Sequence, residues 1–289
     1  MNVLLTGANG QLGSSIRKMS ENESDNYFFT DVDTLDITEE KAVEKFVTDH
    51  NIDLIVNCAA FTNVDAAEDK EELAELLNGS APGILADVMA RKNGSLIHIS
   101  TDYVFGGDKV NTPVNETCAT NPTGVYGLTK LHGEQAVEKS GANHIIIRTS
   151  WLYSEYGSNF VKKILELLSG RDEIKVVFDQ CGTPTYAGDL AKTIVEIISS
   201  RKFEKNPGIY HFSNEGVCSW YDFADAIFHL SGLKNKKVYP CHSDEFPSKV
   251  IRPPYSVMDK TKIKETFGIK IPHWHESLKE CMLHLKRHG

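Results

Sequence analysis

The 289-residue chain lacks several features that would define other classes of protein. No apolar stretch approaches membrane-spanning length, and the short apolar run after Met1 has no basic leader, so we expect a cytoplasmic protein without a signal peptide or membrane anchor. The six cysteines include no Cys-x-x-Cys spacing, which gives no support to a zinc site or a disulfide framework. With a formal net charge of −9, the chain also lacks the basic field that nucleic acid requires.

The composition is that of an ordinary globular protein. Apolar residues make up 40% of the chain and charged residues 25%, which excludes disorder and fibrous repeats. No internal repeat or low-complexity linker is present. The length allows one large α/β domain with an appended lobe, or two domains that share a close interface.

Short apolar runs alternate with longer amphipathic stretches in the first half, which is typical of βαβ units around a parallel sheet. Strands are predicted at Val3–Thr6, Tyr27–Asp31, Leu54–Asn57, Leu96–Ser100 and Ile145–Thr149. Helices are predicted at Gln11–Met19, Glu39–Asp49, Glu71–Lys92 and Gly127–Lys139. Pro82 removes a backbone donor from the third helix, so we expect a kink or two helices there. Thr38 is predicted to cap the second helix, because Glu39 and Glu40 follow it.

After about residue 150 the pattern becomes a less regular mixture of short strands, helices and Pro-containing loops. Strands are predicted at Lys175–Phe178 and Gly208–Phe212, and helices at Gly188–Ser199, Trp220–Leu230 and His275–Lys286. We therefore predict an α/β fold with a doubly wound, Rossmann-like parallel sheet and a smaller C-terminal α/β lobe. Residues 1–150 would form the dinucleotide-binding core with the catalytic residues. Residues 151–289 would mainly bind substrate, with some segments returning to the core.

A glycine-rich turn joins the first predicted strand to the first predicted helix. Gly7, Gly10 and Gly13 allow the backbone to turn tightly and to approach a pyrophosphate, while the helix N-terminus offers free N–H groups. The spacing is G-x-x-G-x-x-G, which differs from the standard G-x-G-x-x-G. Its position after the first strand of a βαβ pattern therefore carries the prediction of a dinucleotide site.

The second and third strand ends supply further candidate cofactor contacts. Asp31 ends the second predicted strand, where a carboxylate accepts hydrogen bonds from the adenosine ribose. This favours NADH, because the 2′-phosphate of NADPH would face a negative charge; Asp33 and Asp36 are equally eligible for that position. Ala59 and Ala60 would leave space beside the cofactor, although a tightly packed strand end would look the same.

Three residues form a candidate catalytic set. Tyr126 and Lys130 are four residues apart on a predicted helix and so share one face. A nearby ammonium favours the phenolate and is expected to lower the pKa of the tyrosine. Thr101 follows the fourth strand, where it can hydrogen-bond a reacting carbonyl oxygen. A lone Tyr-x-x-x-Lys pattern is usually structural. Here it follows the glycine turn and Thr101 along the chain, and this order favours a catalytic role.

These segments together resemble the extended short-chain dehydrogenases/reductases. The matching segments cover nearly the whole chain in the expected order: LLTGANGQLG (4–13), VNCAAFTNVD (56–65), STDYVF (100–105), YGLTK (126–130), RTSW (148–151), DQCGTPTY (179–186) and RPPYS (252–256). The glycine turn and YGLTK occur throughout the superfamily. The segments at 100–105, 148–151 and 179–186 are far more specific.

The resemblance implies a reductase that uses NADH or NADPH to reduce the C4 keto group of a nucleotide-activated deoxysugar. Tyr126 would protonate the C4 oxygen, Lys130 would also hold the nicotinamide ribose, and Thr101 would complete the set. The implied cofactor contacts are Gly7, Asn9, Gly10, Gln11, Leu12, Asp31, Asp36, Ile37, Ala59, Ala60, Thr62, Tyr126 and Lys130. The implied substrate contacts are Val64, Asp102, Tyr103, Trp151, Asn159 and Arg252, the last two toward the diphosphate or base. Trp151 could instead be a core residue, and Arg252 could pair with a surface carboxylate.

One position departs from the pattern that the resemblance implies. Some members dimerise through magnesium held by glutamates, one of them two residues after the third glycine, where this chain has Ser15. A homodimer is compatible with the sequence, but a magnesium-bridged form is not supported and no metal site is predicted.

Two alternative functions stay open. An epimerase or dehydratase could use the same scaffold, with Asp102 as the additional acid that dehydratases need. A non-catalytic protein similar to the regulatory subunit of methionine adenosyltransferase is the other alternative, although it would not need Thr101, Tyr126 and Lys130 together. The base of the nucleotide is not determined, because thymine and uracil differ by one methyl group.

Overall fold

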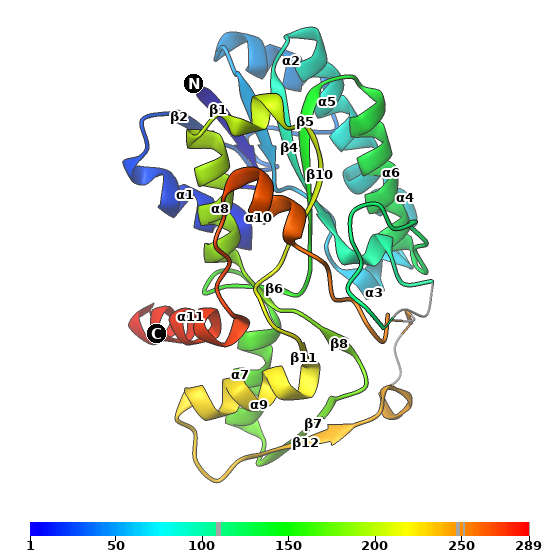
Figure 1. Cartoon of the computed structure of the whole chain (residues 1–289), viewed down its shortest axis with the longest axis vertical. Helices are drawn as coiled ribbons and strands as arrows, with labels where there is room; N and C mark the ends of the chain where they lie inside the picture. The colour runs from blue at the N-terminus through cyan, green and yellow to red at the C-terminus, as the bar shows by residue number, and fades with distance from the viewer. Residues whose placement is uncertain (108–110, 247–248, 251, 289) are drawn as a thin grey trace.

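A six-stranded parallel sheet forms the upper part of the molecule in the computed structural model, which describes residues 1–107, 111–246, 249–250 and 252–288 (Figure 1). The strand order is β10-β5-β4-β3-β1-β2. The strands are β1 (Asn2–Thr6), β2 (Asn26–Phe29), β3 (Leu54–Asn57), β4 (Ser95–Thr101), β5 (Asn143–Thr149) and β10 (Gly208–Phe212). All five neighbouring pairs are parallel, so the carboxyl ends of the strands share one edge. The predicted α/β class with a parallel central sheet is confirmed.

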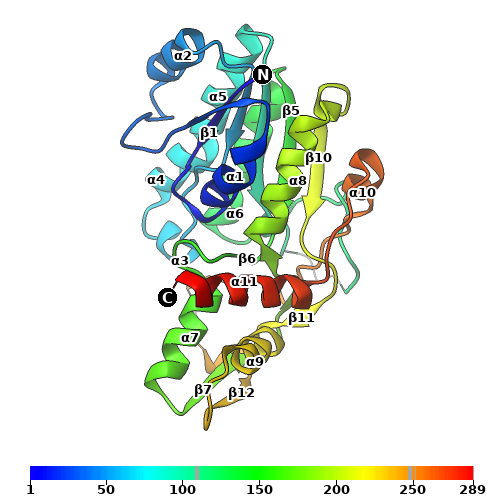
Figure 2. The ribbon, with the colours of Figure 1, turned by 90° about the vertical axis from the view of Figure 1, so that its left-hand side faces the viewer.

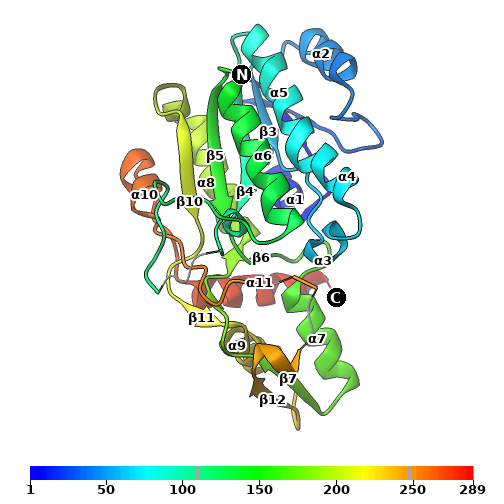
Figure 3. The same ribbon diagram turned by 90° about the vertical axis from the view of Figure 1, so that its right-hand side faces the viewer.

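Helices cover both faces of this sheet because successive strand residues point to opposite sides. Val3 and Leu5 pack with α1 (Gln11–Met19) and α8 (Ala187–Ser199), which lie in front of the sheet in Figure 2. Leu4, which lies between Val3 and Leu5 in β1, points to the opposite face and packs with α2 (Glu40–Asp49), α5 (Ala81–Arg91) and α6 (Val125–Lys139). Figure 3 shows α5 and α6 on this opposite face. The fold is therefore doubly wound.

A smaller lobe lies below the carboxyl edge of the sheet (Figure 1). It packs around a separate apolar cluster that includes Tyr153, Phe223 and Leu278. Its elements are β6 (Leu152–Tyr153), α7 (Phe160–Gly170), β7 (Glu173–Val177), β8 (Cys181–Gly182), β9 (Thr185–Tyr186), β11 (Cys218–Ser219), α9 (Trp220–Ser231), β12 (Lys237–Cys241) and α11 (Trp274–His288). The remaining elements are α3 (Val64–Ala67), α4 (Glu71–Glu75), α10 (Thr261–Phe267) and short helical turns at Ser20–Asn22, Leu76–Ser80, Asp102–Val104, Lys202–Lys205 and Ser243–Glu245.

The chain passes repeatedly between the two parts. After β6–β9 it returns upward as α8, whose Leu190 and Ile194 belong to the same core cluster as Val3. The next strand, β10, pairs with β5 in the upper sheet, and α9 follows in the lower lobe. The chain then returns to the upper part as α10, whose Ile263 packs in the same cluster as Val3. The upper core is thus completed by residues that follow the first lobe segments in sequence.

The predicted interruption of the third helix is confirmed, because the structure has two helices there. The interrupted helix is α4 and α5 joined by a π-helical turn, Leu76–Ser80, with Pro82 in the first turn of α5, where no N–H is needed. The predicted N-cap at Thr38 is wrong, since Glu39 is the N-cap residue. The Thr38 hydroxyl instead donates to Asp36 Oδ1 at 2.7 Å, which takes it away from the helix end.

Within the described part of the chain, no helix has the length and apolar character needed to cross a membrane. The six cysteines are free thiols.

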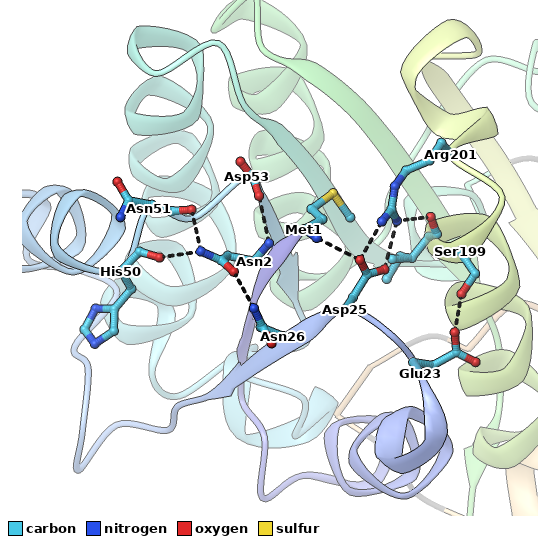
Figure 4. Close-up of polar contacts among 11 residues, drawn as sticks. Met1, Asn2, Glu23, Asp25, Asn26, His50, Asn51, Asp53, Ser199 and Arg201 are labelled. Carbon is cyan, nitrogen blue, oxygen red and sulfur yellow. Dashed lines mark hydrogen bonds and ion pairs between the residues drawn. The ribbon is translucent and has the colours of Figure 1, made fainter.

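An ion-pair cluster ties the amino ends of the sheet to α8 (Figure 4). The buried Asp25 carboxylate accepts from the Met1 ammonium at 2.9 Å and from the Arg201 guanidinium at 2.9 Å. Hydrogen bonding from Arg201 lowers the pKa of Asp25 although burial opposes it. Asp25 therefore joins two segments, near residues 1 and 201, that lie far apart in sequence.

Asp25→Asn should lower the free energy of unfolding at pH 7 by about 1–2 kcal/mol, because two charge-assisted bonds lose their anion. Arg201 is 35% exposed, so solvent screening keeps the loss below that of a fully buried pair. Because the folded pKa is lowered, this contribution is present above the ordinary aspartate pKa and disappears as pH falls through the folded value. Urea unfolding of both proteins at pH 7 and at low pH measures it.

The control is Asp172→Asn, which removes a carboxylate that is 87% exposed beside Lys236. This variant should lose at most about 0.5 kcal/mol. The role given to Asp25 would be contradicted if both variants lost the same free energy of unfolding. It would also be contradicted if the difference in this free energy between wild type and Asp25→Asn were as large at low pH as at pH 7.

Candidate active site

A cavity of about 810 Å³ lies between the carboxyl edge of the sheet and the lower lobe. Residues from both parts line it, among them Gly7 and Thr101 from above and Trp220 from below. Every residue predicted to contact cofactor or substrate lines this cavity except Asn9, whose backbone N–H donates to Asp31 Oδ2 at 3.0 Å. The fold therefore brings together segments spread from residue 7 to residue 252.

The glycine turn is shaped for close approach. Gly7 has φ 64°, and a Cβ there would lie 2.6 Å from the backbone nitrogen of Ala59. Gly10 is the N-cap of α1 without a side-chain cap, so the first amides of α1 are not satisfied by a capping side chain. This arrangement fits a dinucleotide pyrophosphate, which needs free N–H groups, a positive helix end and no obstructing side chain.

Asp31 lies two residues beyond β2, which ends at Phe29 rather than at Asp31 as predicted. Its Oδ2 accepts from Asn9 N at 3.0 Å and its Oδ1 from Val32 N at 2.8 Å. The Arg17 guanidinium lies 3.4 Å from Asn9 Oδ1, so Asn9 stands between a cation and the Asp31 carboxylate that its N–H contacts. Asp36 also lines the cavity, but its Oδ1 is engaged by Thr38. Asp33 is not among the lining residues.

The candidate catalytic residues meet at the centre of the cavity. Thr101 is the last residue of β4, and Tyr126 and Lys130 lie one turn apart near the start of α6. The Thr101 hydroxyl donates to Asp102 Oδ1 at 3.2 Å, and Thr101 is also the side chain that favours the phenolate of Tyr126 against the effect of burial. The Tyr103 ring packs edge-on against Tyr126 at 5.5 Å between centroids. Two hydroxyls therefore converge on the cavity from different elements.

Burial dominates the protonation of this group. It raises the pKa of Tyr126, so the predicted lowering by Lys130 is wrong for this structure. It lowers the pKa of Lys130 to about 8, because the ammonium is almost wholly removed from solvent. It raises the pKa of Asp102 to about 7. Tyr126 therefore holds its proton at neutral pH, as a general acid must.

The Lys130 ammonium group rests on residues that sequence reasoning did not single out. Its Nζ donates to Ile99 O at 2.6 Å and lies 3.4 Å from His98 Nε2. His98 Nδ1 in turn lies 3.1 Å from Asn57 Nδ2, and Asn57 Oδ1 accepts from Thr6 Oγ1 at 2.7 Å. Nothing in the local sequence marks these positions, since the contacts depend on strand register.

Two stacked indoles form the lower wall of the cavity. Trp151 adopts φ 48°, a left-handed conformation that is costly for a bulky residue and is often kept for function. Its ring lies 3.5 Å from that of Trp220, with 8° between their planes. Trp220 is a cavity residue that sequence reasoning missed. Trp151 thus packs inside the lobe and also faces the cavity.

Two polar residues predicted to contact substrate already have protein partners. Asn159 Nδ2 donates to Gln11 Oε1 at 3.0 Å, and its Oδ1 accepts from Lys162 N at the start of α7. Asn159 therefore links the glycine turn to the lobe. The Arg252 guanidinium lies 3.4 Å from Asp65 Oδ2, a long ion pair at the edge of the cavity.

Ser15 is buried, and its hydroxyl donates to Gln11 O within α1. Over residues 1–107, 111–246, 249–250 and 252–288, no group of three or more His, Cys, Asp or Glu residues is arranged to hold a metal ion.

Comparisons with known proteins agree over nearly the whole chain. The family described as "RmlD substrate binding domain" matches residues 1–287. The dTDP-4-dehydrorhamnose reductase of Mycolicibacterium smegmatis is 38% identical over 97% of this chain and 84% of its own. A crystal structure of a dTDP-4-dehydrorhamnose reductase from Clostridium acetobutylicum is 42% identical with a TM-score of 0.93, covering 99% and 100% of the two chains. That of Bacillus anthracis, in complex with NADP, is 37% identical with a TM-score of 0.92, covering 98% and 99%.

Proposed function

This chain belongs to the RmlD substrate-binding-domain family, and on that premise we propose that it reduces the C4 keto group of a dTDP-activated deoxysugar with NADH or NADPH. The preferred substrate is dTDP-4-dehydro-L-rhamnose and the product dTDP-L-rhamnose. The observation that carries the proposal is the meeting of Thr101, Tyr126 and Lys130 in one cavity with the glycine turn. Relatives that bear the reductase name at 38–42% identity support it.

When bound, the reduced nicotinamide supplies the hydride that the carbonyl carbon receives. Gly7, Gly10 and the N-terminus of α1 would hold the pyrophosphate, and Asp31 would accept from the adenosine ribose. Lys130 would hold the nicotinamide ribose through its Nζ. These residues would hold and orient the cofactor in the cavity that Tyr126 also lines.

The chain's own residues manage the proton and the developing negative charge. Tyr126 is protonated at neutral pH and donates its hydroxyl proton to the C4 oxygen as that oxygen gains charge. Thr101 donates a hydrogen bond to the same oxygen and so stabilises the charge before the proton arrives. The product alcohol and a Tyr126 phenolate result, and Lys130, with a pKa of about 8, lies one helical turn away to favour reprotonation.

The lower wall is the proposed sugar-nucleotide subsite. Val64, Asp102, Tyr103 and Trp151 surround the reacting end, and the Trp151–Trp220 stack supplies a flat apolar face. Arg252 and Asn159 are placed for the diphosphate or base. Arg252 would exchange its 3.4 Å contact with Asp65 for a shorter bond to phosphate.

The direct test supplies candidate 4-keto nucleotide sugars with NADH and follows the loss of absorbance of the reduced cofactor. Stoichiometric consumption of NADH supports a reductase. An epimerase or dehydratase would turn over without net consumption of NADH. The observation that favours this alternative is the buried Asp102 carboxylate, which accepts from Thr101 and could act as the additional acid. Absence of turnover together with co-purification of a methionine adenosyltransferase would favour the regulatory alternative.

We place the protein in the cytoplasm, a proposal supported by its six free thiols, since reducing compartments keep cysteines unpaired. Its proposed partner is the nucleotide sugar rather than nucleic acid or a membrane. A homodimer, if formed, would not use Ser15 as a magnesium ligand.

NADH is expected to be the better donor by about tenfold, equivalent to about 1.4 kcal/mol. The Asp31 carboxylate would repel the 2′-phosphate of NADPH, while Arg17, 3.4 Å from Asn9, partly offsets that repulsion. Asp31→Ala should narrow or invert the preference, mainly through the dissociation constants of the two cofactors. Titrations of wild type and variant with NADH and NADPH measure it.

Asp31→Asn is the matched variant, because it keeps an acceptor for Asn9 N–H and removes only the charge. Asp33→Ala, outside the cavity, should leave the ratio unchanged. A strong wild-type preference for NADPH, or a ratio untouched by both changes at Asp31, would move the ribose contact to Asp36.

A further inference from the structure

A row of fully buried polar side chains lies beneath Lys130. Thr6 and Asn57 are the last residues of β1 and β3, and His98 is the middle residue of β4; Thr6 is the register partner of Asn57, and Asn57 is that of His98. Their exposed fractions are 1%, 0% and 0%. The proposed chemistry uses none of the three. Buried polar groups are costly unless each is paired, so the direction of every bond in the row is constrained.

The orientation of the Asn57 amide follows from a backbone donor. Ala59 N–H, which can only donate, lies 3.1 Å from Asn57 Oδ1, and Thr6 Oγ1 lies 2.7 Å from the same oxygen. Turning the amide over would place its NH₂ group against Ala59 N–H. Asn57 Nδ2 therefore faces His98, 3.1 Å from Nδ1.

The tautomer of His98 follows in turn. An amide NH₂ only donates, so His98 Nδ1 must accept and cannot carry hydrogen. Burial holds the pKa of His98 well below its usual value, which makes the ring neutral. A neutral imidazole carries one hydrogen, and here it must be on Nε2. That N–H points at Lys130 Nζ, 3.4 Å away.

If Lys130 were an ammonium, its N–H groups would face the His98 Nε2–H, and two hydrogen-bond donors would meet with no acceptor between them. A neutral amine has a lone pair that accepts from His98 Nε2–H while one of its hydrogens bonds Ile99 O at 2.6 Å. We propose that His98 is a positioning residue, locked by Asn57 in the Nε2–H tautomer, that disfavours the charged form of Lys130. Its consequence for turnover rests on the proposed reductase function, but the tautomer and the protonation of Lys130 do not.

The other groups that face Lys130 do not produce the same effect. Glu134 on α6 favours the ammonium, although its carboxylate is already paired with Arg148 at 2.7 Å. Cys58 follows β3, and burial raises the pKa of its thiol to about 12, so it is neutral at working pH. Tyr126 keeps its proton. Burial opposes the charge on Lys130, and in this proposal the His98 N–H is the second group that does so.

Nitrogen-15 NMR of histidine-labelled protein tests the tautomer without substrate. The His98 signals, assigned by their loss in His98→Gln or by through-space contact with the Asn57 amide, should show hydrogen on Nε2 and none on Nδ1. A proton on Nδ1, or a doubly protonated ring at neutral pH, would overturn the proposal. This measurement is independent of the reaction, so it separates a failure here from a failure of the reductase assignment.

Asn57→Asp tests the link to Lys130. A carboxylate accepts from Ala59 N–H and Thr6 as before, but it would also accept from Nδ1–H, which moves the His98 hydrogen and presents a lone pair to Lys130. The titration midpoint of the ¹³Cε-labelled Lys130 signal should rise by about 1 unit or more. In a His98→Leu background the same change should produce a much smaller shift. If Asn57→Asp raised the titration midpoint of Lys130 by the same amount in the His98→Leu background, the new carboxylate would be acting on Lys130 directly through its charge, and the proposal would be overturned.

Discussion

Replacing Tyr126 by phenylalanine should lower kcat by about 10²- to 10⁴-fold and leave NADH affinity nearly unchanged. The ring and its edge-on contact with Tyr103 remain, while the transferable proton is lost. Because burial raises the pKa of Tyr126, wild type keeps this proton through the neutral range and above it. Steady-state kinetics with a 4-keto nucleotide sugar and a separate NADH titration measure the two quantities.

The matched control is Tyr239→Phe, on the exposed strand β12 of the lower lobe. It removes the same hydroxyl far from the cavity and should leave kcat unchanged. If Tyr126→Phe retained a near-normal rate across pH, another group would be the proton donor, and Asp102 would be the first candidate because its pKa is raised to about 7.

Lys130→Met should damage both cofactor binding and rate, with a loss of about 10²-fold or more in kcat/KM. The side chain is 2% exposed, and on the proposed function its Nζ would hold the nicotinamide ribose. Since the pKa of Lys130 is lowered to about 8, the ammonium loses its proton as pH rises through that value. Wild-type kcat/KM should therefore fall above about pH 8, and this limb should be absent in the variant.

Lys260→Met provides a control, because Lys260 is also buried but pairs with Glu215 away from the cavity. It should reduce stability while the folded enzyme keeps its NADH affinity and its basic limb. Unchanged NADH affinity in Lys130→Met, together with a basic limb that stays near pH 8, would make Lys130 a structural helix residue.

The sequence predicted those parts of the site whose signals are local. β1, the glycine turn and α1 were predictable because an apolar run, three glycines and an amphipathic stretch follow one another, and α1 has the predicted bounds Gln11–Met19. Tyr126 and Lys130 were placed on one helix face by spacing alone. In contrast, the prediction that Thr38 caps α2 failed. Its hydroxyl bonds Asp36 instead, and residue type alone does not show which of the two partners it takes.

Contacts set by register were beyond sequence reasoning. Asn57 and His98 are 41 residues apart, and they meet only because β3 pairs with β4 at that register. Trp220 begins an ordinary capped helix, and nothing near it indicates that its ring stacks on Trp151. The effect of burial on the pKa of Tyr126 was likewise missed, since the spacing to Lys130 says nothing about how much solvent reaches the hydroxyl.

The repeated passage of the chain between its two parts has a consequence for any attempt to divide it. A fragment that ended near residue 150 would lack β10 and α8, so β5 would become an open edge strand, and the apolar side chains around Val3 and Leu5 would lose the cover that α8 provides. Open edges and uncovered apolar faces promote aggregation. Residues 1–150 are therefore not a separable module, because later segments of the chain complete the sheet and part of its apolar core.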